Sequence, residues 1–260
     1  MMSYWTRRVA VLFVGLIVAT SVGSISSAKA ETFVGVTVDE RLTLGLQVDE
    51  AAAQAWLPDG WVVAEVGSGP FTGANLMAVF VDRLLQLNAE GEPSGGGAFK
   101  AMALMVPAKR ANTQETANMI IRIYSAHDGA GPYKNSAKAD VSREATTNGT
   151  NISGGAGNET WQVNPASGGA VTLNVEYQRE VPTPQSQETR PRSAVEPDFF
   201  RIYYVNQLVD IVNSTSDGVD RAPSHGLSVT VPELADMFDG NEKLVGIAVT
   251  PSYTRQTFLP

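Results

Sequence analysis

The sequence predicts an α+β fold made mainly of antiparallel β-strands, and three observations support this prediction. Alternating apolar and polar residues, and short apolar runs, recur along the chain, as they do in half-buried and fully buried strands. Glycine, proline, asparagine and aspartate residues separate these runs and favour turns. Only two or three short segments have the features of a helix. This pattern favours an antiparallel sheet or barrel over alternating β–α units.

In the first half of the chain, a β-hairpin is expected from residues 33–38 and 42–48, which alternate around Asp39-Glu40-Arg41. Asp49 then caps a short alanine-rich helix over residues 50–56. That helix ends at Leu57-Pro58, because the residue before a proline is driven out of the helical region. Further strands are predicted at residues 61–66, 76–81, 102–106 and 119–124, with a glycine-rich loop at 87–97.

In the second half, strands are predicted at residues 171–177, 199–205, 227–231 and 244–249. Turns are expected at 148–157, which is rich in Gly, Asn and Thr, and an exposed excursion at 182–197, which is rich in Pro, Gln and Ser. A second short helix is expected at 232–238, because Pro232 suits its first turn and Gly240 follows its end. We find no internal repeat.

The first thirty residues have the order of a secretory signal peptide. Arg7 and Arg8 precede an apolar run at residues 9–22, and Ala28-Lys29-Ala30 offers small residues two apart. A membrane anchor is the alternative, but the apolar run is shorter than the roughly 20 residues that a span needs. We therefore expect cleavage after Ala30, a periplasmic or secreted protein, and a single domain over residues 31–260 with no membrane span after processing.

Composition excludes several classes of site and partner. The net charge of −8 becomes more negative by three units once Arg7, Arg8 and Lys29 are removed, which disfavours nucleic acid as a partner. The chain has no cysteine, so thiolate nucleophiles and thiolate metal sites are excluded. Its two histidines, His127 and His225, are about a hundred residues apart, so no metal site is expected. A Ser-His-Asp triad could use only these two, and no G-x-S-x-G motif is present.

Lysine is the sparse residue type that can carry chemistry here. Beyond residue 30 the lysines are Lys100, Lys109, Lys134, Lys138 and Lys243. Lys134 and Lys138 share one face of a predicted extended segment, with Ser136 between them and roughly 13 Å separating them. A lysine attacks a carbonyl only when burial or a nearby cation lowers its pKa. The alternative is that both are solvated at a strand edge, where they prevent sheet-to-sheet association.

Four segments, in their order and spacing, resemble the acetoacetate decarboxylase-like family from about Glu50 to the C-terminus. They are Trp56-Leu57-Pro58-Asp59-Gly60-Trp61, residues 75–82, residues 98–107 ending in Val106-Pro107, and Gly131-Pro132-Tyr133-Lys134-Asn135-Ser136-Ala137-Lys138. The resemblance implies a cone-topped antiparallel β-barrel around one internal cavity and a small carbonyl or keto-acid ligand. It also implies that Lys134 is a Schiff-base (imine-forming) nucleophile and that Tyr133, Ser136 and Lys138 contact the substrate. No separate cofactor is expected, and a homo-oligomer is possible.

The chain departs from the family pattern at key positions. Asn135 stands where the family carries a second lysine, and Lys100 or Ala101 where it carries a cavity glutamate. In a second register, Gly131-Pro132-Tyr133-Lys134 matches an earlier Gly-Pro-Tyr-Arg stretch of the family, and no Schiff-base lysine remains. Three functions stay open: a Schiff-base lyase or decarboxylase, a non-catalytic small-molecule binding protein that uses the same cavity, and a structural export-linked protein without a ligand.

The signal-peptide interpretation predicts the N-terminus of the exported protein. Protein recovered from the periplasm or the medium of expressing cells should begin at Glu31, as N-terminal sequencing or intact mass would measure. A cytosolic product that retains Met1 would contradict export.

Overall fold

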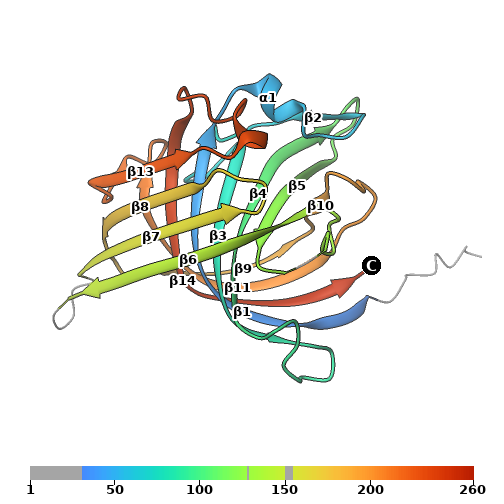
Figure 1. Cartoon of the computed structure of the whole chain (residues 1–260), viewed down its shortest axis with the longest axis horizontal. Helices are drawn as coiled ribbons and strands as arrows, with labels where there is room; N and C mark the ends of the chain where they lie inside the picture. Colours follow the sequence, from blue (N-terminus) through green and yellow to red (C-terminus); the bar gives the residue numbers. More distant parts are fainter. Residues whose placement is uncertain (1–30, 128, 150–154) are drawn as a thin grey trace, which may run out of the picture. The chain divides into compact units, whose positions relative to one another are not determined.

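Long, curved strands of one large mixed sheet make up most of the chain (Figure 1). The computed structural model describes residues 31–127, 129–149 and 155–260. The predicted signal peptide lies outside the described residues. Residues 31–260 cluster as one compact unit. No helix in the described part of the chain is both long enough and apolar enough to cross a membrane.

Fourteen strands and two short helical segments are described. The strands are β1 (Thr32–Gln47), β2 (Trp61–Val63), β3 (Leu76–Leu87), β4 (Phe99–Arg110), β5 (Thr116–Ser125), β6 (Ser136–Asn148), β7 (Ala156–Pro165), β8 (Val171–Gln178), β9 (Thr183–Thr189), β10 (Arg192–Ser193), β11 (Ile202–Ser214), β12 (Val219–Asp220), β13 (Ser224–Val229) and β14 (Lys243–Leu259). The helical segments are α1 (Glu50–Gln54) and the 3₁₀ turn η1 (Pro232–Leu234).

The main path of the sheet runs β12-β11-β14-β1-β3-β4-β5-β6-β7-β8-β13. Its ladders are antiparallel except β5–β6, while the side strand β10 also pairs with β5 in parallel. In the described part of the chain, β12 and β13 end the path without pairing with each other. The mainly antiparallel β prediction is therefore confirmed, whereas the closed, cone-topped barrel is not.

The predicted N-terminal hairpin is wrong, because β1 is one continuous strand. Its whole length pairs with β14 on one side, and most of it pairs with β3 on the other. Asp39-Glu40-Arg41 is a bulge within the strand, where the register against β14 shifts, and not a turn. The charges that suggested a turn instead have partners on both faces of the sheet, as described below.

Other differences concern the polar segments. The predicted excursion at 182–197 contains the exposed strand β9, which pairs with β11, and the short strand β10, in which Ser193 is buried. Strand β7 was not predicted, although every second residue from Gly157 to Pro165 is buried. The helix α1 is confirmed, with the Asp49 carboxylate accepting from the Ala52 N–H at 2.8 Å. The second predicted helix is only the 3₁₀ turn η1.

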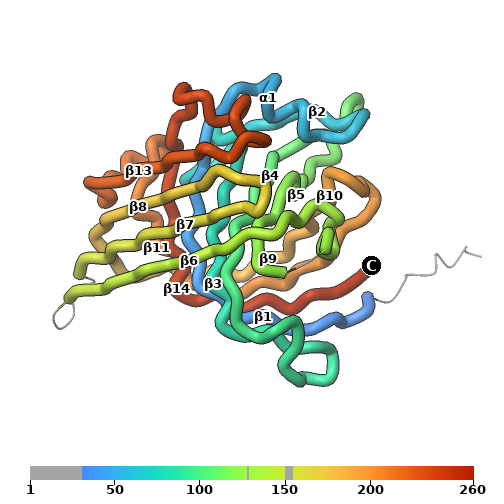
Figure 2. Tube along the Cα trace, in the orientation of Figure 1, coloured from blue at the N-terminus to red at the C-terminus, as the bar shows by residue number. Residues whose placement is uncertain are grey.

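The main hydrophobic core lies between two parts of the sheet. Strands β6, β7 and β8 cross the upright strands β14, β1 and β3 in Figure 2. Phe80 of β3 and Trp161 of β7, both fully buried, meet there with ring centroids 5.5 Å apart. A second, smaller cluster on the other face contains Ile120, Tyr133, Tyr203, Val205 and Tyr253.

The position of Phe80 predicts a large loss of stability when its ring is removed. Phe80→Ala should lower the free energy of unfolding by about 3–5 kcal/mol, since a buried ring is replaced by a cavity. Urea denaturation would measure this loss. The control Leu84→Ala, at a half-exposed position of the same strand, should change it by less than about 0.5 kcal/mol. Equal effects of the two substitutions would contradict the described core.

Candidate functional site

Two polar clusters lie on opposite faces of the neighbouring strands β1 and β3. The ladder pairs Asp39 with Arg83, and Glu40 with Asp82. Successive residues of a strand point to opposite faces. Asp39 and Arg83 therefore serve one cluster, whereas Glu40 and Asp82 serve the other.

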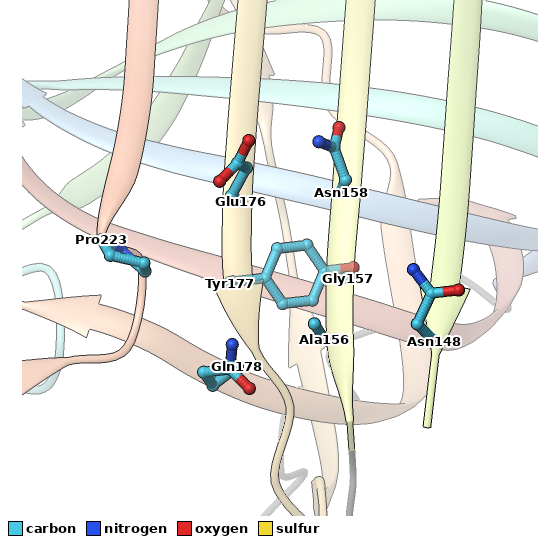
Figure 3. A pocket seen from close by; sticks show the side chains of 8 residues that line it. All are labelled: Asn148, Ala156, Gly157, Asn158, Glu176, Tyr177, Gln178 and Pro223. Atoms are coloured by element: carbon cyan, nitrogen blue, oxygen red, sulfur yellow. The ribbon is translucent and has the colours of Figure 1, made fainter. Parts of the chain in front are cut away.

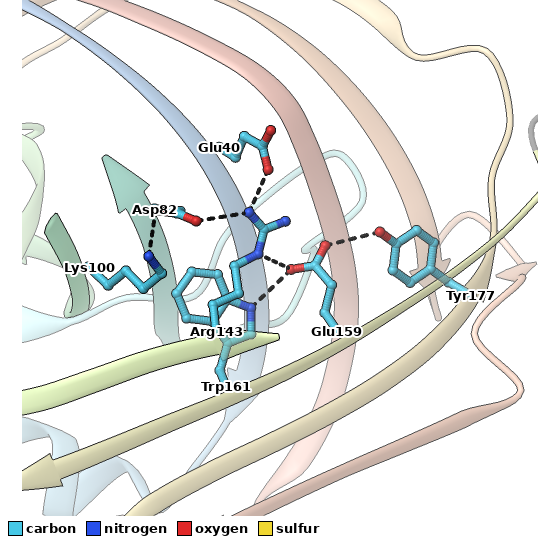
Figure 4. A network of polar contacts seen from close by, with 7 residues as sticks. All are labelled: Glu40, Asp82, Lys100, Arg143, Glu159, Trp161 and Tyr177. Carbon is cyan, nitrogen blue, oxygen red and sulfur yellow. Dashed lines mark hydrogen bonds and ion pairs between the residues drawn. The ribbon is translucent and has the colours of Figure 1, made fainter. Parts of the chain in front are cut away.

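The first cluster, which we call the Arg143 network, adjoins the main core through Trp161 and Tyr177 (Figure 4). It comprises Glu40, Asp82, Lys100, Arg143, Glu159, Trp161 and Tyr177. The Arg143 guanidinium pairs with Glu40, with Asp82 at 3.2 Å and with Glu159 at 3.0 Å. Glu159 also accepts hydrogen bonds from Trp161 Nε1 and the Tyr177 hydroxyl, both at 3.0 Å.

The Arg143 network is internally satisfied. Burial, together with the charge and hydrogen bond of Glu159, raises the pKa of Tyr177 above its usual range, so its hydroxyl remains a donor. Lys100 pairs with Asp82 at 3.2 Å. The network therefore fits a structural role better than a catalytic one.

The second cluster, which we call the Arg/Tyr cluster, lies on the other face of the same strands. It comprises Asp39, Arg41, Arg83, Tyr133, Tyr203, Tyr253 and Arg255. Asp39 is fully buried and pairs with Arg41 at 2.5 Å and with Arg83 at 2.9 Å. The strands β14, β1 and β3 bring these residues together, since Asp39 lies opposite both Tyr253 and Arg83.

Tyrosine rings line the Arg/Tyr cluster. The Arg41 guanidinium lies 3.3 Å from the centroid of Tyr253, and that of Arg255 lies 4.1 Å from the centroid of Tyr203. The hydroxyls of Tyr203 and Tyr133 are hydrogen-bonded at 2.6 Å. Burial and the neighbouring Tyr203 raise the pKa of Tyr133 well above its usual value, so it stays protonated.

Polar atoms in and beside the Arg/Tyr cluster have no hydrogen-bond partner among the described residues. Arg255 Nε and Thr37 Oγ1 are buried and have no hydrogen-bond partner among the described residues, and these two residues lie opposite each other on β14 and β1. Arg201 Nε, just before β11, is in the same condition. Buried donors of this kind carry a desolvation cost until an acceptor reaches them. The cluster therefore has the donors and the positive charge that an anion needs.

The structure brings only one of the four predicted site residues into either cluster. Tyr133 is buried in the Arg/Tyr cluster, held there by Ser193 Oγ, which donates to its carbonyl at 2.6 Å. Ser136 is half-buried at the start of β6, and Lys138 is exposed on β6 opposite Ser125.

Lys134 is exposed, so the predicted burial of its amine in a cavity is wrong for this conformation. It ends a turn with φ near +60°, and its neighbours Tyr133 and Asn135 occupy the interior instead. The Asn135 amide donates to the Ile120 carbonyl, which fixes the chain on this side of the turn. Desolvation, on which activation of Lys134 depended, is therefore missing.

Sequence reasoning missed most of the Arg/Tyr cluster. Asp39 and Arg41 were assigned to a turn, and Arg83, Tyr203, Tyr253 and Arg255 were not singled out. A usable signal was present, because Tyr253 and Arg255 alternate with polar residues directly after an apolar run. Charged residues within long alternating strands call for partners on one face of the sheet.

A separate shallow cleft of about 210 Å³ lies where β7 begins and β8 ends (Figure 3). Tyr177 covers Gly157 there, where a Cβ atom would lie only 2.4 Å from the ring. Among the described residues that line the cleft, Glu176 is the one charged side chain, and its negative charge does not favour an anion. In the described part of the chain, no group of three or more His, Asp or Glu side chains is placed to hold a metal ion.

The chain matches no family model and no curated protein. Solved structures do match it. The enduracididine biosynthesis enzyme MppR complexed with pyruvate aligns with a TM-score of 0.54 and 15% identity, over 90% of this chain and 91% of that one. An acetoacetate decarboxylase-like enzyme from Sphingomonas wittichii RW1 aligns with a TM-score of 0.54 and 12% identity, over 88% and 91% of the two chains.

This chain has the acetoacetate decarboxylase-like fold. The resemblance predicted from the sequence is thus confirmed at the level of the fold. A third structure, MppR with the condensation product of pyruvate and imidazole 4-carboxaldehyde, aligns with a TM-score of 0.52 over 90% of both chains. Identities this low say nothing about chemistry, because one fold hosts many activities.

The environment of Asp39 predicts a pH-dependent contribution to stability. Burial acts to raise the pKa of its carboxyl, but the charges of Arg41 and Arg83 outweigh burial and hold the pKa below the ordinary value of 3.8. Asp39→Asn should lower the free energy of unfolding by about 3–5 kcal/mol at neutral pH, because it leaves buried guanidinium groups without their carboxylate.

The sign of the pH dependence follows from the lowered pKa. The difference between wild type and Asp39→Asn should be complete above about pH 4 and should shrink as the pH falls through the folded-state pKa. Urea denaturation at several pH values would measure it. Asp236→Asn, at an exposed position, is the control and should change little at any pH. A difference independent of pH would contradict an ionised Asp39.

Proposed function

We propose that this chain is an exported, non-catalytic binding protein for a small carboxylate, such as a keto acid, held at the Arg/Tyr cluster. The observation that carries the proposal is the surplus of guanidinium groups around one buried carboxylate, where Arg255 Nε and Thr37 Oγ1 have no partner among the described residues. Guanidinium groups form strong, charge-assisted hydrogen bonds with carboxylates. The pyruvate bound to MppR, which shares this fold, supports the same class of ligand.

The rival function is a Schiff-base lyase or decarboxylase with Lys134 as nucleophile. The position of Lys134 supports this rival, because it directly follows Tyr133 of the Arg/Tyr cluster in the sequence. For the rival to operate, the turn would have to rearrange and carry the amine from solvent into the interior. The binding proposal uses side chains that already lie beside Tyr133, so it is the leading proposal.

Export to the periplasm or the medium is part of the same proposal. It is supported by the basic, apolar and small-residue order of residues 1–30. The absence of cysteine is compatible with an oxidising compartment, since a chain of this length can rely on its core without disulfides.

The proposal predicts reversible binding without a covalent intermediate. In isothermal titration calorimetry with a panel of small carboxylates that includes pyruvate and acetoacetate, at least one should bind. Arg255→Gln should weaken that binding by about tenfold or more, because a charged hydrogen bond is lost. The control Arg190→Gln, which removes an exposed arginine, should leave it unchanged.

Borohydride treatment separates the two functions. With the same carbonyl compounds, it should leave the mass of the protein unchanged, and Lys134→Ala should bind the ligand as the parent does. A reduced adduct that maps to Lys134 would favour the lyase instead. If no member of the panel binds, the binding proposal fails.

A further inference from the structure

We infer that the ligand of the Arg/Tyr cluster is a dicarboxylate. Its two carboxylates pair with Arg255 and Arg201, whereas a monocarboxylate would leave one of these positive charges unmatched. This inference rests on the proposed binding function and deepens it. It starts from how the charges of the cluster are distributed.

The single carboxylate of the Arg/Tyr cluster is already occupied. Asp39 is within ion-pair distance of both Arg41 and Arg83, and Arg83 also donates to Gln86 at 2.8 Å. Neither Arg255 nor Arg201 forms an ion pair with any described acidic residue. The cluster and its border thus hold four guanidinium groups against one carboxylate.

Arg255 and Arg201 border the same pair of tyrosines. Arg255 stacks on the Tyr203 ring, and Arg201 precedes Tyr203 by two residues on the same face of the chain that leads into β11. The positive charges of both arginines also act to lower the pKa of the Tyr133 hydroxyl, against the larger effects of burial and Tyr203 that raise it. The two unpaired cations therefore lie around the Tyr133–Tyr203 hydroxyl pair.

The tyrosine pair adds one donor to the two cations. The hydroxyls are 2.6 Å apart, so one proton is used between them and the other is free to reach a ligand oxygen. Thr37 Oγ1, opposite Arg255, is a further unpartnered hydroxyl. These groups fit oxygen acceptors at separate points of a ligand.

Charge matching then discriminates between ligand classes. A monocarboxylate would satisfy one guanidinium and leave the other desolvated without a counter-charge, which is costly. A second carboxylate removes that cost and adds a charge-assisted hydrogen bond. Two separate planar guanidinium groups suit two separate carboxylates better than one compact phosphate.

Matched probe pairs test this inference. Titration calorimetry should compare α-ketoglutarate with α-ketovalerate, and glutarate with valerate, because each pair shares its carbon skeleton and differs by one carboxylate. We expect the dicarboxylate of each pair to bind at least about tenfold more tightly at low salt. Inorganic phosphate is a third probe and should bind more weakly than either dicarboxylate.

Substitutions of arginine test whether Arg201 binds the second carboxylate of the ligand. Arg201→Gln should remove most of the advantage of the dicarboxylates while changing the affinity for the monocarboxylates by less than about twofold. Arg190→Gln, which also removes one positive charge, should change neither affinity. Thermal unfolding of each variant confirms that it is folded before its affinity is compared.

The outcomes separate this inference from the function on which it rests. Equal or tighter binding of the monocarboxylates, or tighter binding of phosphate, would overturn the dicarboxylate inference and leave carboxylate or anion binding in place. An advantage that survives Arg201→Gln at full size would overturn the role of Arg201. The absence of binding by every probe would overturn the proposed function itself.

Discussion

The structure depends on how Arg143 joins two parts of the sheet inside the core. Its guanidinium, carried by β6, pairs with Glu40 of β1, Asp82 of β3 and Glu159 of β7. Charges taken out of water are tolerated only when their hydrogen-bonding groups are satisfied. Here Trp161 and Tyr177 complete the set around Glu159, so the position of β6 and β7 over β1 and β3 is fixed by partners as well as by apolar packing.

The alternation of side chains along β1 explains why one strand can serve two clusters of opposite character. Glu40 faces the Arg143 network, whereas Asp39 and Arg41 face the Arg/Tyr cluster. In the network, each carboxylate contacts Arg143, and the buried Glu159 also accepts hydrogen bonds from Trp161 and Tyr177. In the Arg/Tyr cluster, buried donors are left over. This contrast is the physical reason for assigning structure to the first cluster and binding to the second.

Local patterns predicted much of the sheet and little of the site. Apolar alternation located the strands around Leu76, Met102, Met119 and Val171, and Asp49 marked the start of α1. The hairpin around Glu40 was wrong because charged residues also occur within strands when distant segments supply their partners, here Arg83 and Arg143, which lie 44 and 103 residues away in sequence from Asp39 and Glu40. The orientation of Lys134 depended on a left-handed turn, which no periodicity reports. The Arg/Tyr cluster joins five segments of the chain, so only the tertiary fold could assemble it.

Lysine and arginine side chains differ in whether they can react with a carbonyl group. A lysine becomes a nucleophile when its surroundings make it neutral, whereas a guanidinium stays charged and cannot form an imine. In this chain the interior beside Tyr133 is occupied by guanidinium groups, and the amine of Lys134 lies in solvent. Burial lowers the pKa of Arg83, whereas the negative charge of Asp39 acts in the opposite direction and favours the charged guanidinium. Such an interior favours the proposed reversible binding of an anionic ligand over imine formation at Lys134.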